Sequence, residues 1–243
     1  MTNDRLVGNL LTMFIAGTET TSITITSCLW ELVHDPSLMK ELTVEAQSMT
    51  NFDTASIEEI FQSLPKLRSL FYEVVRLRGP SSIIALENTV SLRTKNNTVF
   101  PKGTQMFAML KFVGKNCNDG GGVPIGPKGE PHSIFCPRRW LVSNRNEHHN
   151  DDNNNNNIDV TMKVMKPSAK NGIPYSTGFG FGARICPGQD LSELESLICL
   201  ALLLRTFDIT IGKNHSPIRW VTNLVEGPDK PIRLCFERKT HTK

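Results

Sequence analysis

The chain has 243 residues, which is enough for one large domain or two small ones with a buried core. Its 27 basic and 24 acidic residues are interspersed and leave a formal net charge of +3, so the charge pattern does not indicate nucleic acid as a partner. Six cysteines at wide, irregular spacing form no CxxC pair, which argues against a disulfide framework or a zinc knuckle and favours a reducing compartment.

The N-terminal segment 6–33 is apolar and long enough to cross a bilayer, because Glu19 and Glu31 are its only formally charged residues. Its many Thr and Ser residues argue against a membrane span, as does Glu19, since a carboxylate in lipid costs several kcal/mol. The pattern therefore favours a long helix buried in protein and apolar nearly all round. The preceding residues, MTNDRL, have no basic start or cleavage site, so we expect no export signal.

Further helices are expected over 35–80. Asp35 is a candidate cap with Pro36 at the first helical position, and two more helical patterns meet near Pro65 and end at Gly79. From 83 to 112, β-branched runs punctuated by Asn-Asn and Pro-Lys-Gly predict short strands and hairpin turns. A small sheet should therefore follow the helices.

The segment 114–157 is rich in Gly, Pro and Asn and ends in a low-complexity run, which predicts loops and insertions. His148 and His149 lie in that run, and we interpret them as solvated residues and not as metal ligands. Apolar residues at helical spacing from Leu191 predict another helix, and PIRLCFERK near the C-terminus predicts a closing strand. The fold class expected is mainly α with small β-sheets.

The stretch FGFGARICPG places one cysteine, Cys186, among glycines and just before a predicted helix. A helix N-terminus favours the thiolate over the thiol, so Cys186 could be a catalytic nucleophile, a metal ligand or a buried core residue. No cysteine–histidine hydrolase signature accompanies it, and the histidines lie in loops or near the chain ends. An aromatic residue, an arginine and open backbone fit a flat anionic macrocycle better.

The pattern F-x-x-G-x-R-x-C-x-G, formed by Phe179, Gly182, Arg184, Cys186 and Gly188, resembles the signature of the cytochrome P-450 family of heme-thiolate monooxygenases. The resemblance implies that Cys186 is the axial ligand of the heme iron and that Arg184 meets a heme propionate. Phe179 and the glycines would shape the pocket around the sulfur. Thiolate ligation pushes electron density to the iron and favours O–O cleavage.

The sequence AGTETT at 16–21 resembles the distal-helix motif of the same family. The resemblance implies that a gap at Ala16 and Gly17 admits dioxygen and that Glu19 and Thr20 relay protons, as an acid beside a hydroxyl can do. Taken alone, these residues also fit a polar stripe on a buried helix.

Glu73 and Arg76 are three residues apart on one helix, a spacing that also occurs on many solvated helices. EVVR nevertheless resembles the family's E-x-x-R motif, and Arg139 in FCPRRW matches the arginine that completes a Glu-Arg-Arg triad. The implied role is structural. A buried triad would lock the loop approaching Cys186 to the helix that carries Glu73.

The resemblance implies the C-terminal half of the P-450 fold, from the distal (I) helix to the C-terminus, and a missing N-terminal half. One departure is Leu86, which stands where the family usually has a basic residue that binds a propionate. The expected parts are the distal helix (1–34), helices with E-x-x-R (35–80), a small sheet (83–112), loops and insertions (114–157), and the heme-thiolate loop, proximal helix and closing strands (175–243).

The function implied is a monooxygenase that inserts one oxygen atom of O2 into an apolar organic substrate, with electrons from an NADPH-dependent flavoprotein reductase. Whether this chain is active by itself stays open. The alternatives are a truncated, inactive family remnant and a noncatalytic heme-binding protein. The location is open as well: the family implies the endoplasmic-reticulum membrane, whereas the chain shows no anchor, which leaves the cytoplasm as the alternative.

Overall fold

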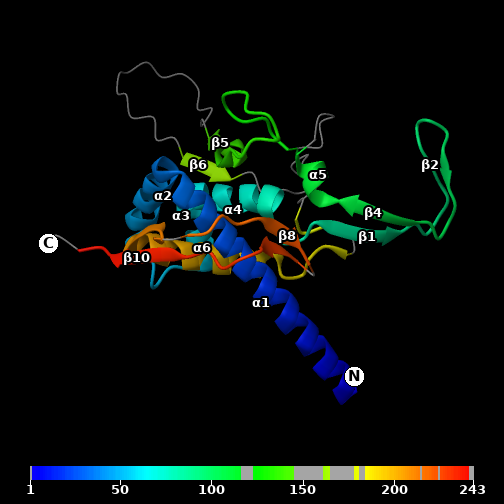
Figure 1. Cartoon of the computed structure of the whole chain (residues 1–243), viewed down its shortest axis with the longest axis horizontal. Helices are drawn as coiled ribbons and strands as arrows, with labels where there is room; N and C mark the ends of the chain where they lie inside the picture. The colour runs from blue at the N-terminus through cyan, green and yellow to red at the C-terminus, as the bar shows by residue number, and fades with distance from the viewer. Residues whose placement is uncertain are drawn as a thin grey trace, which may run out of the picture.

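A computed structural model describes residues 2–115, 123–144, 161–164, 178–180, 184–213, 215–223 and 225–240. Its helices pack around one central helix, α4, and short pairs of strands lie at the periphery (Figure 1). The helices are α1 (Asn3–His34), α2 (Pro36–Ser48), α3 (Ile57–Ser63), α4 (Pro65–Arg78), α5 (Leu110–Lys115) and α6 (Gln189–Thr206), with the 3-10 helix η1 (Pro137–Trp140).

The strands of the described residues form five antiparallel pairs. They are β1 (Ile83–Glu87) with β4 (Gln105–Met109), β2 (Leu92–Arg93) with β3 (Val99–Phe100), β5 (Leu141–Asn144) with β6 (Thr161–Val164), β7 (Phe207–Ile211) with β10 (Leu234–Arg238), and β8 (Trp220–Thr222) with β9 (Glu226–Pro228). The expected class, mainly α with small sheets, is confirmed. Within 114–157, where we expected loops, η1 and β5 form, and β5 depends on a partner beyond the low-complexity run.

Local signals set several helix ends where the sequence suggests them. The Asp35 side chain accepts the Leu38 N–H at 3.0 Å and caps α2, which begins at Pro36. α4 ends at Gly79, where a β-carbon would come within 2.4 Å of the Val75 carbonyl oxygen. Glycine is therefore required at that turn by the close approach of the backbone.

The core centres on α4, in which ten of the 14 residues are buried. Leucines from four helices meet in one apolar cluster, among them Leu32 of α1, Leu42 of α2, Leu70 of α4 and Leu200 of α6. All four are inaccessible to solvent. The same central helix also carries charged residues into the interior, and these build the site described below.

The N-terminus of α4 is capped from α2 by Glu45. The two carboxylate oxygens of Glu45 accept the backbone N–H groups of Lys66 and Leu67, each at 2.8 Å. A carboxylate is favourable there because the first N–H groups of a helix have no intrahelical acceptor and carry partial positive charge. This contact fixes α4 against α2.

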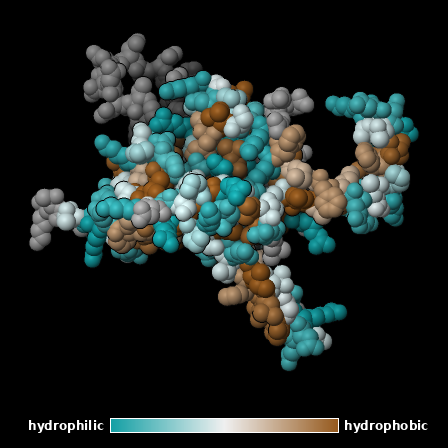
Figure 2. Space-filling model, viewed as in Figure 1, coloured by the Kyte–Doolittle hydropathy of each residue, from teal (hydrophilic) through white to brown (hydrophobic). Residues whose placement is uncertain are grey.

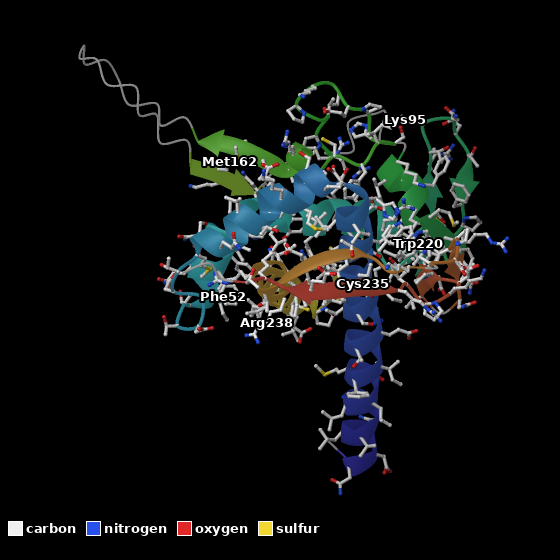
Figure 3. The ribbon with its side chains drawn as sticks, turned by 60° about the vertical axis from the view of Figure 1, so that its left-hand side comes forward. Phe52, Lys95, Met162, Trp220, Cys235 and Arg238 are labelled. Carbon is white, nitrogen blue, oxygen red and sulfur yellow. The ribbon has the colours of Figure 1, made fainter. Side chains whose placement is uncertain are left out.

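Helix α1 is buried only in its second half. Thr21, Thr24 and Leu32 face the core, whereas residues 3–19 are exposed, so our expectation of a helix buried along its length is wrong for the first half. The exposed N-terminal half of the helix projects from the body formed by the other elements (Figures 1 and 3).

The projecting half of α1 is apolar, and its side chains form the hydrophobic streak seen in Figure 2. No helix in the described part of the chain has the length and apolar content needed to cross a membrane. The large apolar residues of the projecting half that are more than 40% exposed are Leu6, Val7, Leu10, Leu11, Met13, Phe14 and Ile15.

Shortening a leucine side chain to alanine should affect stability differently in the two halves of α1. Leu32→Ala removes a fully buried side chain, so the free energy of unfolding should fall by about 2–5 kcal/mol. Leu10→Ala, at a site 57% exposed, should change it by less than about 0.5 kcal/mol. Urea unfolding followed by circular dichroism measures both, and equal losses would contradict the packing of α1.

Glu45 should make stability depend on pH. Burial raises the pKa of Glu45 to about 7, above its ordinary value in an unfolded chain. The folded protein thus binds this proton more tightly, so the unfolding free energy should fall as the pH rises from about 5 to about 7. Glu45→Gln should flatten that fall, while Glu237→Gln, at an exposed site, should not. Identical pH profiles for the two variants would refute the assignment.

Candidate functional site

Cys186 lies in a tight loop that leads into α6, three residues before Gln189. Its N–H donates to the Phe179 carbonyl at 2.8 Å, and the Gln189 N–H approaches the Cys186 carbonyl at 3.4 Å. Gly180 has a φ of +72°, in the left-handed region that glycine adopts without strain. The loop is folded back on Phe179 and enters α6 through Gly188.

The Cys186 loop rests on α4 through an aromatic contact. The ring of Phe179 stacks on Phe71, with centroids 6.1 Å apart. A β-carbon on Gly178 would lie 2.2 Å from Cγ1 of Val75, so a larger residue there would force the loop or the Val75 side chain to shift. Gly182, which we expected to shape the pocket, lies outside the described residues.

A cavity of about 270 Å³ separates this loop from α1. Thr20 and Thr24 line it from α1, while Phe179, Arg184 and Cys186 line it from the loop. Residues that are more than 150 positions apart in the sequence therefore line the same cavity. Arg184 is exposed, and Cys186 is half-buried.

Not all residues of the distal-helix motif reach this cavity. Gly17 and Glu19 lie in the exposed part of α1 and are not among the residues that line it. A β-carbon on Gly17 would meet nothing within 4 Å. Thr20 is the motif residue at the cavity, and its hydroxyl donates to the Ala16 carbonyl at 2.7 Å.

Sequence reasoning missed the contact between Thr21 and Ser192, which joins α1 to α6, and it missed Thr24 at the cavity. The hydroxyl of Thr21 lies 3.2 Å from the hydroxyl of Ser192, at hydrogen-bonding distance. Thr24, one turn after Thr20, also lines the cavity. The i, i+4 spacing of Thr20 and Thr24 could have indicated Thr24, because it places both side chains on one helix face. Ser192 carried none, since its partner is far away in sequence.

Glu73, Arg76 and Arg139 meet as a fully buried cluster. The Arg76 guanidinium donates to both Glu73 oxygens at 2.6 and 2.9 Å, and Arg139 Nε donates at 3.1 Å. The Trp140 indole N–H and the Cys136 backbone N–H complete the set at 2.9 and 2.7 Å. Charge-assisted bonds of this kind offset the desolvation of the buried charges.

The two arginines also bind backbone carbonyl groups of the chain between α4 and η1. Arg76 donates to the carbonyls of Gly114, His132 and Ile134. Arg139 shares the Ile134 carbonyl and reaches two proline carbonyls, those at 124 and 131. The described contacts of the cluster thus join α4 to α5, to the segment 123–136 and to η1. The Cys186 loop contacts α4 at other residues, Phe71 and Val75.

Comparison with known proteins gives one consistent family. The profile of the family described as "Cytochrome P450" matches residues 1–119 and 130–236. The chain is 27% identical over 241 residues to the mitochondrial sterol 26-hydroxylase of Mus musculus, covering 97% of this chain and 39% of that protein. It is 27% identical over 240 residues to cytochrome P450 10 of Lymnaea stagnalis, covering 98% of this chain and 38% of that protein.

A solved structure agrees with these matches. A cytochrome P450 crystal structure superposes with a TM-score of 0.73 at 20% identity, covering 98% of this chain and 46% of that one. The chain spans 38–39% of the length of the first curated relatives that it matches. The likeness therefore extends over nearly the whole of this chain and over part of each relative.

Loss of the Glu73 charge should be costly. Glu73→Gln leaves two buried guanidinium groups without a carboxylate, so the unfolding free energy should fall by about 3–5 kcal/mol. Glu41→Gln is the matched control, because Glu41 pairs with Lys66 and Arg138 near the surface, where such pairs contribute about 0–1 kcal/mol. Denaturant unfolding compares them, and a loss at Glu73 no greater than at Glu41 would show that the cluster is not a structural centre.

Proposed function

Because the chain belongs to the cytochrome P450 family, whose cofactor is heme, we propose that Cys186 is the axial thiolate ligand of a heme iron. The protein of which this chain forms all or part is then a monooxygenase that inserts one oxygen atom of O2 into an apolar organic substrate. The observation that carries this proposal is the cavity shared by Cys186 and Thr20, which brings the thiol and a hydroxyl from α1 to one space.

The residues around the cavity suit such a group. Heme needs one axial ligand from the protein, an apolar surface for its ring and a cation for its carboxylates. Cys186 offers the sulfur, Val75 and Ile84 offer apolar contact, and the Arg184 guanidinium offers the charge. Gly188 adjoins the sulfur, since a β-carbon there would make an ordinary van der Waals contact with Cys186 Sγ at 3.9 Å.

Residues of α1 would donate protons into the cavity and resupply them from solvent. The heme, when bound, supplies the activation of dioxygen. We assign to the Thr20 hydroxyl the donation of a proton into the cavity, because Thr20 lines that space. The hydroxyl donates to the Ala16 carbonyl in this structure, so it would turn from that acceptor toward the cavity to do so. Glu19 is exposed beside it and would restore the proton from solvent. Gly17 would keep one side of the helix open for dioxygen.

Partner and location are proposed from the relatives. Family membership implies a redox partner protein, and we assign to it the class of NADPH-dependent flavoprotein reductases. Several relatives are named as mitochondrial, which supports a mitochondrial location over the endoplasmic-reticulum membrane expected from the sequence. The hydroxylases among them, named for a sterol and for 25-hydroxyvitamin D, support an apolar substrate.

A second candidate function is heme binding without turnover. It is favoured by the position of Gly17 and Glu19, which lie outside the cavity that Cys186 lines. In that case the axial ligand would be in place while the route for protons would not. Turnover with a reductase and candidate substrates, measured on chain that has bound heme, separates the two functions.

The thiolate ligand gives a direct optical test. Chain supplied with heme, reduced and treated with carbon monoxide should show a thiolate-type absorption band, which Cys186→Ala should abolish. Cys235→Ala is the matched control, since Cys235 is an exposed cysteine on β10, and it should keep the band. A band that survives Cys186→Ala, or no band in folded chain that contains heme, would refute the assignment of the ligand.

A further inference from the structure

A second buried carboxylate lies close to the Cys186 loop. Glu193 is in the second turn of α6, seven residues after Cys186, and its side chain is inaccessible to solvent. A carboxylate in such a place must be matched by donors, because removing it from water without them costs several kcal/mol. Glu195, two residues further along the same helix, is exposed. The burial is therefore particular to Glu193.

Two hydrogen-bond partners of Glu193 come from the central helix. Arg68 Nε donates to one carboxylate oxygen at 2.7 Å, and the Tyr72 hydroxyl donates to the other at 2.6 Å. Arg68 and Tyr72 are one turn apart on α4, so they project from the same face toward α6. Each oxygen of Glu193 thus accepts a separate hydrogen bond from α4, which restrains the rotation of the carboxylate as well as its position.

Both donors are themselves held. The Arg68 guanidinium lies over the ring of Phe61 at 4.7 Å and also donates to the Phe61 carbonyl. Tyr72 is 2% exposed and contacts the indole of Trp140, with centroids 6.0 Å apart. Burial and the Glu193 charge raise the pKa of Tyr72, so its hydroxyl stays a donor. Trp140 also donates to Glu73, so the ring of Tyr72, which binds Glu193, packs against a residue that binds the other buried carboxylate.

Adjacent residues of α4 therefore hold the Cys186 loop at both of its ends. Phe71 stacks on Phe179, whose carbonyl accepts the Cys186 N–H. Tyr72 bonds to Glu193 on the other side of the loop. The segment from 179 to 193 is thus attached to one rigid helix at its start and its end.

From these contacts we propose that Glu193 is a positioning residue for Cys186. It fixes the first turns of α6 to α4, and thereby sets the position of the sulfur relative to the cavity that Thr20 lines from α1. The inference rests on the proposed function, since the position of the sulfur matters for chemistry only if Cys186 binds the heme iron.

The test compares three variants of the full chain. Glu193→Gln keeps the size of the side chain and removes its charge, and Tyr72→Phe removes a single hydroxyl. Glu195→Gln makes the same change as the first variant at an exposed position of the same helix and serves as the control. Two quantities are measured: the fraction of bound heme that gives the thiolate-type band with carbon monoxide, and the amide hydrogen exchange of residues 186–192 in heme-free chain.

Loss of the Glu193 charge should loosen the Cys186 loop and lower the fraction of heme that gives the thiolate-type band. In Glu193→Gln, exchange over 186–192 should be about tenfold faster, as expected when a buried charge-assisted hydrogen bond is lost, while exchange in α2 stays unchanged. The thiolate-type fraction at equal heme content should fall well below that of Glu195→Gln. Tyr72→Phe should change the exchange rate and the thiolate-type fraction in the same directions but by less. If Glu193→Gln does not fold, the comparison of Tyr72→Phe with Glu195→Gln tests the positioning role.

The outcomes separate this inference from the proposed function. If unmodified, folded chain gives no thiolate-type band, the proposed function fails, and the exchange comparison alone decides whether Glu193 holds the loop. If the band is present, equal band fractions in Glu193→Gln and Glu195→Gln overturn the positioning role, even where exchange differs, because the effect is then on stability alone. Equal exchange rates overturn it as well.

Discussion

The buried carboxylate of Glu73 is the constraint on which the rest of this structure depends. A charge without solvent must be surrounded by donors, and here two guanidinium groups, an indole and a backbone N–H supply them. Since those donors come from α4 and from the region around η1, the described part of the connection between them, residues 123–136, is held against α4. The spare N–H groups of Arg76 and Arg139 then bind the carbonyls of that connection.

Helix α4 consequently carries buried charged and polar side chains through an otherwise apolar core. One face carries Glu73 and Arg76 toward η1, another carries Arg68 and Tyr72 toward α6, and leucines such as Leu70 fill the space between. Ionic groups in such positions add little net stability compared with apolar residues. Their requirement for specific partners fixes how the elements lie against one another, and the cavity beside Cys186 is bounded by elements positioned in this way.

Much of this arrangement could be predicted from local sequence. Asp35 with Pro36 and the break at Gly79 mark helix ends, because caps and glycine act within a few residues. The spacing of Glu73 and Arg76 placed them on one helical face, and Gly180, in the glycine-rich stretch around Cys186, has a φ of +72° that glycine adopts without strain. These features depend on short-range geometry, and sequence patterns report such geometry well.

The long-range contacts could not be predicted in the same way. Nothing in the sequence relates Glu193 to Arg68 or Ser192 to Thr21, because each pair is more than a hundred residues apart and meets only through the packing of helices. The exposure of the first half of α1 was missed for a related reason. Its apolar composition predicts burial, but burial depends on whether another element packs against it, and periodicity carries no such information.

The central claim is that Cys186 binds the heme iron at the cavity it shares with α1. X-ray absorption at the iron edge, measured on chain loaded with heme, tests this directly because it distinguishes sulfur from nitrogen and oxygen in the first coordination shell. The account predicts one sulfur neighbour in the unmodified chain and none in Cys186→Ala. A first shell of nitrogen and oxygen alone in the unmodified chain, or sulfur that persists in Cys186→Ala, would contradict it.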